Sequence, residues 1–213
     1  MKIFSFKTFA VTTAFLALFS TYSIAQVQIG VHGSRLISER GDWGGGAFVK
    51  GFLGDNIAVG GSVKVYPKRF STETSMLGTR SIRRSEGDLF VPVTGSVDIF
   101  LTNGLFRPYI GSDIGLYYHK YFFRVDDDTD GTNLLDYNRS KTYFGVGPRL
   151  GFAVQSGIIG LFAQFQYNYL FGTVKGGETL LVPGVNANIT TNPVQSFTSI
   201  DVGVYFRVGG DAN

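Results

Sequence analysis

The chain contains no cysteine, which excludes disulfide bonds, thiolate metal sites and cysteine nucleophiles. Charge is scarce as well: Asp, Glu, Lys and Arg make up 16% of the 213 residues, against about 25% in an ordinary globular domain. The formal net charge of +3 is too small to favour a nucleic-acid partner. What the chain has instead is 29 glycines, 20 phenylalanines and 11 tyrosines. A fold for this chain must explain why it is rich in glycine and aromatic residues and poor in charge.

The N-terminal segment has the organisation of a secretory signal peptide. Lys2 and Lys7 precede an apolar run over Phe9–Phe19, and small residues stand at Ser23 and Ala25. The apolar run is shorter than the ~20 residues that a membrane-spanning helix needs. We therefore expect residues 1–25 to be a signal peptide that is cleaved after Ala25.

After Ala25 the sequence contains eight segments in which every second residue is apolar. This period of two is typical of strands with one apolar face. Most segments are roughly 9 to 14 residues long, which suits a strand that crosses a bilayer at a tilt. Their apolar positions lie within Val27–Val31, Ala47–Leu53, Ile57–Val65, Leu89–Leu101, Ile110–Tyr118, Phe144–Val154, Ile159–Tyr169 and Ile200–Val208.

The opposite face of these strands decides between two closed architectures. A soluble lipocalin-type barrel is apolar inside and polar outside, whereas a membrane barrel is the reverse. The polar face here is rich in glycine and its few charges nearly cancel, which suits a narrow lumen better than a surface in water. We predict an all-β fold, an eight-stranded antiparallel transmembrane up-and-down β-barrel. Its lumen charge network would consist of Lys50, Lys64, Asp98, Asp113, Arg149, Asp201 and Arg207.

The connections between the segments alternate between short and long. Outer-membrane barrels have short turns on the periplasmic side and long loops outside the cell, so we expect both ends of the barrel domain to be periplasmic. The short connections are Gly54–Asn56, Thr102–Leu105 and Ser156–Gly157, and the long ones are Ser38–Asp42, Pro67–Asp88, Phe122–Ser140 and Gly172–Gln195.

Two strands carry motifs of a known family. Arg107–Tyr117 and Gly145–Gly151 are similar to the Pro-Tyr-x-Gly-x-x-x-Gly and Gly-x-Gly-x-x-x-Gly strands of small outer-membrane barrels. On these motifs the chain resembles the OmpA-like and OmpX-like outer-membrane β-barrel domains. The resemblance covers 26–208 as the barrel domain, with 209–213 as a short C-terminal tail. It implies an integral protein of the Gram-negative cell outer membrane, exported by the signal peptide.

The last strand looks like the β-signal by which the barrel-assembly machinery recognises its substrates. That signal reads polar-x-Gly-x-x-aromatic-x-hydrophobic, and the matching residues are Asp201, Gly203, Phe206 and Val208. The strand is an unpaired edge until the barrel closes, so an edge-presenting signal is expected there.

Two of the long connections carry candidate binding residues. Asp126, Asp128 and Asp130 alternate before Gly131, as at the start of a calcium loop. The alternative is a solvated acidic loop, and no other cofactor is expected. A group of basic residues in the second long connection, Pro67–Asp88, suits the phosphates of lipopolysaccharide. The alternative is again a solvated loop. This group is Lys68, Arg69, Arg80, Arg83 and Arg84.

The function expected from the sequence is a structural or surface-interaction role through the extracellular loops, without catalysis. The expected partners are outer-membrane lipid, lipopolysaccharide, the assembly machinery and a surface or host protein, and the barrel is expected to be a monomer. One alternative is a narrow channel for small ions or solutes. Another is a lipid-modifying enzyme that uses His32 and Ser34, with Glu39 nearby.

Overall fold

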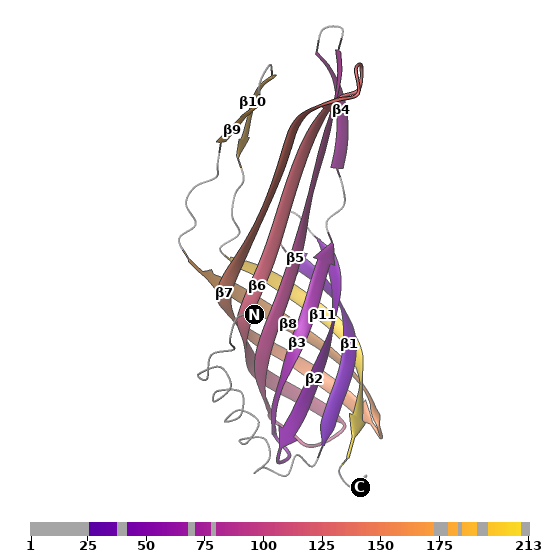
Figure 1. Cartoon of the computed structure of the whole chain (residues 1–213). Coiled ribbons are helices and arrows are strands. Elements are labelled where there is room, and N and C mark those ends of the chain that lie inside the picture. Colours follow the sequence, from indigo (N-terminus) through magenta and orange to yellow (C-terminus); the bar gives the residue numbers. More distant parts are fainter. Residues whose placement is uncertain are drawn as a thin grey trace, which may run out of the picture.

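The alternating segments all form antiparallel strands in the computed structural model (Figure 1). The structure describes residues 26–37, 42–67, 71–77, 80–172, 179–182, 185–190 and 196–209; the expected signal peptide and most of the expected tail lie outside them. No helix in these segments has the length and hydropathy needed to cross a membrane. The described strands are β1 (Val27–Ile37), β2 (Trp43–Leu53), β3 (Ile57–Pro67), β4 (Ser71–Leu77), β5 (Arg80–Phe100), β6 (Phe106–Asp127), β7 (Thr132–Ser156), β8 (Ile159–Phe171), β9 (Thr179–Val182), β10 (Val185–Thr190) and β11 (Ser196–Val208).

The main sheet closes on itself. Its nine strands have the order β3-β2-β1-β11-β8-β7-β6-β5-β4, and β3 also pairs with β5. Because β4 pairs only with β5, the other eight strands form the ring. The first and last strands lie side by side, from Val27 opposite Val208 to Ile37 opposite Thr198. The predicted eight-stranded antiparallel barrel is confirmed, and β9 and β10 form a separate hairpin.

The barrel is apolar outside and filled inside. Along β8 buried and exposed residues alternate almost without interruption. Outward-facing Leu161 is 58% exposed and inward-facing Tyr205 only 1%. The backbone N–H and C=O groups pair around the ring, so a barrel of this kind has no open edge to solvate.

Inward-facing glycines make room for inward-facing aromatic rings. Tyr205 lies directly opposite Gly160 on the next strand, and a Cβ at Gly160 would overlap the tyrosine ring. Gly30 stands in the same relation to the Phe48 ring. The excess of glycine and the excess of aromatic residues therefore have one cause, which is the packing of a narrow lumen.

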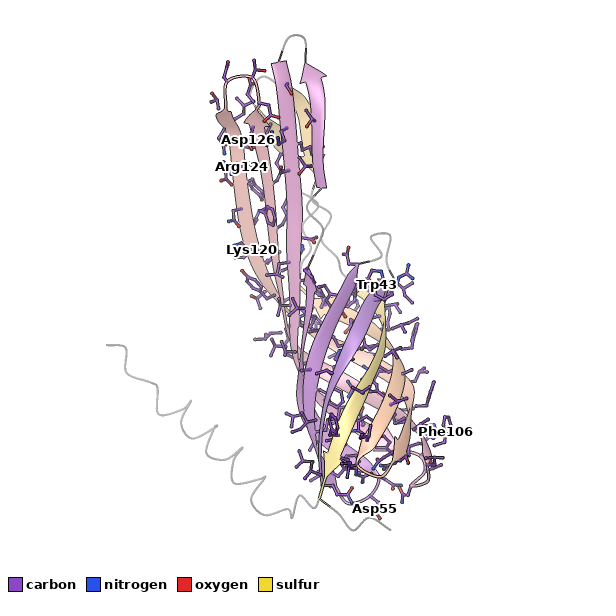
Figure 2. The ribbon with its side chains drawn as sticks, turned by 90° about the vertical axis from the view of Figure 1, so that its right-hand side faces the viewer. Trp43, Asp55, Phe106, Lys120, Arg124 and Asp126 are labelled. Atoms are coloured by element: carbon purple, nitrogen blue, oxygen red, sulfur yellow. The ribbon has the colours of Figure 1, made fainter. Side chains whose placement is uncertain are left out.

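The short connections lie together at one end of the barrel, here called the turn end. Gly54 and Gly157 adopt φ values of 72° and 60°, which L side chains rarely adopt and which a tight turn requires. Figure 2 shows Asp55 at this end, with Lys120 just beyond the opposite end and Arg124 and Asp126 farther out. We call that opposite end the loop end.

The expectation that Pro67–Asp88 and Phe122–Ser140 are loops was wrong. β5, β6 and β7 run through them as strands of 21, 22 and 25 residues. With β4 they form a sheet that projects from the loop end (Figure 1). Its strands persist because Ile82, Phe123 and Val125 form a buried apolar cluster of their own. We call this projection, residues 71–77, 80–88, 119–127 and 132–141, the loop-side sheet.

Candidate functional site

Arg149 on β7 is the centre of an ion-pair network in the lumen. Its Nε and Nη2 donate to Asp98 Oδ1 at 2.9 and 2.7 Å, and its Nη1 donates to Asp113. Lys50 Nζ donates to the other oxygen of Asp98 at 2.7 Å. Four predicted lumen charges, from β2, β5, β6 and β7, thus form one connected group.

A second group joins the first through an amide. Lys64 Nζ donates to Asp201 Oδ2 at 2.6 Å and to Gln166 Oε1 at 2.7 Å. The amide nitrogen of Gln166 donates in turn to Asp113 Oδ2 at 2.9 Å. The combined network holds three cations and three carboxylates, so its formal charge is zero.

Neutrality matters here because Asp98, Asp113 and Asp201 are 0% exposed. A buried carboxylate is tolerated when cations and hydrogen-bond donors satisfy its oxygens, and it is strongly destabilising when they are removed. Each of these carboxylates has at least one cationic partner and a second donor. This arrangement can brace the strands across the lumen, but it leaves no carboxylate free for general acid–base work.

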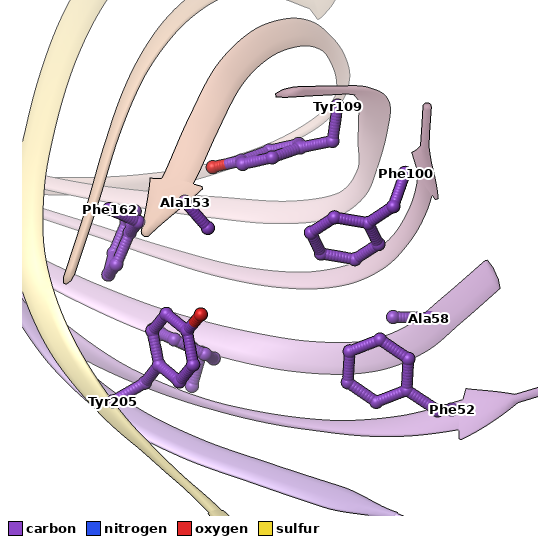
Figure 3. Close-up of a cluster of buried hydrophobic side chains, with 8 residues drawn as sticks. Phe52, Ala58, Phe100, Tyr109, Ala153, Phe162 and Tyr205 are labelled. Atoms are coloured by element: carbon purple, nitrogen blue, oxygen red, sulfur yellow. The ribbon is translucent and has the colours of Figure 1, made fainter. Parts of the chain in front are cut away.

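Aromatic and aliphatic layers lie on both sides of the network. The layer toward the turn end contains Phe48, Phe52, Ala58, Phe100, Tyr109, Ala153, Phe162 and Tyr205 (Figure 3). The layer toward the loop end contains Leu36, Tyr66, Tyr117, Tyr143, Leu170 and Phe197. Between them a cavity of about 10 Å³ lies beside His32, which is room for about one water. The lumen is packed rather than open.

Arg207, predicted as part of the network, lies apart from it. Its guanidinium lies 4.3 Å from the centre of the Phe52 ring, and Nη1 donates to Gln155 Oε1 at 3.0 Å, near the turn end. Arg107 lies close by and was not predicted as a lumen residue. It is 3% exposed and donates to the Asp55 carbonyl oxygen at 2.7 Å. The alternation of side chains could have identified Arg107 as a lumen residue. It is two positions from Tyr109 on β6 and so faces the same side of the strand.

His32 and Ser34 both face the lumen, as their parity indicates. Ser34 Oγ is hydrogen-bonded to Tyr66 Oη at 2.6 Å and to Asp201. Both ring nitrogens of His32 are buried without a hydrogen-bond partner in the described part of the chain, and its ring contacts Phe48 and Phe162. Glu39 lies outside the described residues. Ser34 is thus bonded to groups other than His32, and neither side chain faces the lipid side.

The residues of the β-signal pattern lie on both faces of β11. Asp201 and Gly203 point into the lumen, while Phe206 and Val208 are 52% and 65% exposed on the outer wall. Gly203 is required sterically, because a Cβ there would overlap the backbone of β1. The role of these residues in assembly stays a prediction.

The aspartates of the third connection are not gathered around a common point. Asp126 pairs with Arg124 at 3.0 Å, and Asp128 pairs with Arg83 at 2.8 Å. Within the described ranges no three His, Cys, Asp or Glu side chains form a metal-binding group. The calcium site at Asp126, Asp128 and Asp130 stays a prediction that this geometry does not favour.

Of the basic group in the second long connection, the structure describes the side chains of Arg83 and Arg84 alone, so its lipopolysaccharide contact stays a prediction. Lys68 and Arg69 lie outside the described residues, as does the side chain of Arg80. Arg83 is taken up by its pair with Asp128, and Arg84 lies 4.9 Å from the centre of the Phe123 ring.

Comparison with known proteins places the fold. No family model and no curated protein matches the chain. Among solved structures, Ail, the attachment invasion locus protein of Yersinia pestis, superposes with a TM-score of 0.51 at 14% identity, over 86% of this chain and 97% of that one. The chain has the fold of the small eight-stranded outer-membrane β-barrels.

Two further small barrels superpose less closely. Neisserial surface protein A has a TM-score of 0.42 at 17% identity and covers 87% of this chain and 96% of its own. OprG of Pseudomonas aeruginosa has a TM-score of 0.45 at 12% identity, with 87% and 97% covered.

Proposed function

We propose that the chain is an integral outer-membrane protein, with its turn end in the periplasm and its loop end outside the cell. The observation that carries this proposal is the reversed polarity of a closed barrel. Ion pairs are buried in the lumen while residues such as Leu150 and Val202, 60% and 59% exposed, cover the outer wall. An apolar wall of this extent is unfavourable in water, and it suits lipid.

Within the membrane, we propose a structural or surface-interaction role without catalysis. The packed lumen supports this role over a channel, because solutes would have to displace both aromatic layers and an ion-pair network that bridges the strands. The inward position of His32 and Ser34 supports it over lipid modification. We propose that the assembly machinery recognises β11. This strand pairs with β1 in the closed barrel.

The loop-side sheet is the part of the protein best placed to meet a partner. Ail, the similar barrel, is described as an attachment invasion locus protein and as a complex with the heparin analogue sucrose octasulfate. The segments of the loop-side sheet carry charges of both signs: Arg80, Arg83, Arg84, Lys120, Arg124, Arg139 and Lys141 against Glu73, Glu86, Asp88, Asp126, Asp127 and Asp136, of which Asp88 and Asp127 are buried. We therefore propose attachment to another protein surface in preference to a densely sulfated polymer.

Gel mobility tests the membrane proposal. The chain should fold in detergent micelles into a form that migrates differently in a denaturing gel before and after heating, because a closed barrel resists the detergent until it is heated. In intact cells, external protease should cut the loop-side sheet and spare Gly54–Asn56. Extraction as a soluble species without a mobility change would contradict the proposal.

Cell adhesion tests the interaction role. The variant trims the loop-side sheet by removing 71–86 and 124–135. This deletes β4 and the parts of β5, β6 and β7 farthest from the barrel, and it leaves the barrel parts of those strands in place. Cells that display the wild-type protein should adhere to protein-coated surfaces more strongly than cells with the trimmed variant, and heparin-coated surfaces serve as the comparison. The gel-mobility change must persist in the trimmed variant. Equal adhesion of the two would contradict the role.

A further inference from the structure

One charged side chain interrupts the apolar outer wall over the described residues of β1, β2, β3, β8 and β11. Arg35 is exposed on the outward face of β1, two residues before that strand ends at the loop end. At the outward positions of β1, β2, β3, β8 and β11 in the described residues, no other residue is charged. The neighbours of Arg35 on this face include Ile37 and Ile200, which are 51% and 43% exposed. The guanidinium therefore lies within an exposed apolar surface of the kind that suits lipid.

Trp43 is the direct cross-strand neighbour of Arg35. The two residues are opposite one another in the β1–β2 register, and the guanidinium carbon lies 5.1 Å from the centre of the indole ring. Trp43 is 67% exposed and is the only tryptophan of the chain. Figure 2 shows it at the loop end of the barrel, on the side away from Asp55. No carboxylate of the described residues is paired with Arg35.

In the proposed outer-membrane location, these two residues suit the level of the lipid headgroups. Tryptophan is enriched where hydrocarbon meets the headgroup layer, since its ring is apolar and its N–H is polar. A cationic side chain on the lipid face costs about 2–4 kcal/mol at the midplane and about 0–1 near the interface. An arginine beside tryptophan therefore belongs at the interface, where its fork of N–H donors matches the oxygens of a phosphate.

We propose that Arg35 and Trp43 form a site on the outer wall for a phosphate group of lipopolysaccharide. The site rests on the proposed outer-membrane location, in which the loop end lies in the leaflet that holds this lipid. Charge complementarity supplies the attraction: an exposed guanidinium that pairs with no carboxylate of the described residues faces a layer of phosphate monoesters. The outward apolar residues on the turn-end side of Arg35, Val31 and Val202, contact the acyl chains below, and the indole ring holds the guanidinium at the level of the phosphate.

The single tryptophan makes the site directly observable. The full chain is folded in dodecylmaltoside micelles and titrated with bisphosphorylated lipid A while the emission of Trp43 is recorded. We expect a saturable change with the wild-type protein. Arg35→Gln should raise the half-saturating concentration about tenfold, which is the loss of one charge-assisted hydrogen-bonded contact. Arg35→Lys keeps the charge and loses the fork of N–H donors. Its half-saturating concentration should lie between those of the wild-type protein and Arg35→Gln.

Lys120→Gln is the matched control, because Lys120 is a cation on the outward face of β6, beyond the barrel wall. Its titration should equal that of the wild-type protein. An unchanged titration with Arg35→Gln overturns the site, and an equal response to dephosphorylated lipid A or to phosphatidylglycerol overturns the choice of ligand. Both results leave the outer-membrane proposal standing if the heat-dependent gel mobility is intact. A chain that never shows that mobility contradicts the membrane proposal instead.

Discussion

Replacing Arg149 by methionine should be among the most destabilising changes in this barrel. The substitution removes three N–H donors that serve two carboxylates, both 0% exposed. Asp98 keeps Lys50, but Asp113 keeps only the amide of Gln166. The network changes from neutral to a charge of −1 among side chains that are almost completely buried. Breaking a buried ion pair from one side costs about 3–5 kcal/mol.

A second substitution separates charge imbalance from lost packing. In Arg149→Met with Asp113→Asn, two cations again face two carboxylates, and the new amide oxygen can still accept from Gln166. We expect the double variant to recover about 2 kcal/mol relative to the sum of the single variants, since contacting charges couple by about 0.5–3 kcal/mol. Leu150→Met, the outward-facing neighbour of Arg149, is the control and should change stability by less than about 0.5 kcal/mol.

The measurement is equilibrium unfolding by urea in lipid vesicles. Trp43 fluorescence and the mobility of unheated samples in gels follow the transition independently. A cost below about 1 kcal/mol for Arg149→Met, together with strict additivity in the double variant, would refute the reasoning. It would mean that water screens these charges and that the lumen is wet.

Three other predictions concern packing, conduction and metal binding. Gly160→Ala should cost about 1–3 kcal/mol by overpacking, because its Cβ would overlap Tyr205, whereas outward-facing Gly95→Ala, whose nearest contacts are 3.8 Å away, should be nearly neutral in the same urea assay. In planar bilayers the wild-type protein should show no stable conductance, because both lumen layers are packed; steady openings that a lumen substitution abolishes would establish a channel. Calcium should leave the thermal unfolding temperature of the wild-type protein unchanged, because Asp126 and Asp128 already have arginine partners; an upward shift that Asp128→Asn removes would restore the calcium site.

One of the predicted lumen charges lies outside the network. Arg207 has the parity of the lumen charges, yet it lies toward the turn end beside Arg107 and Phe52. The odd or even position of a residue tells which face of the strand its side chain occupies. The level of that side chain along the barrel axis depends instead on how far neighbouring strands are staggered. Six of the seven predicted lumen charges meet in the network, and the seventh is removed from it by height alone.

The length of the strands at the loop end was misjudged for a related reason. Pro67–Asp88 and Phe122–Ser140 are rich in charged and turn-forming residues, so local propensity favours loops. The strands continue because Ile82 from β5 packs against Phe123 and Val125 from β6. That contact joins residues some forty positions apart, and a reading of local pattern cannot detect it.

The sequence by itself determined the number of barrel strands, the face each side chain occupies and the reversed polarity of the wall. These features follow from the alternation of side chains along a strand, which is a local property of the extended chain. Only the tertiary structure decided which charges pair, where Arg107 and Arg207 lie, how far β5, β6 and β7 project and that Arg35 meets Trp43. Those features depend on the register between strands, and register is set by closure of the whole barrel.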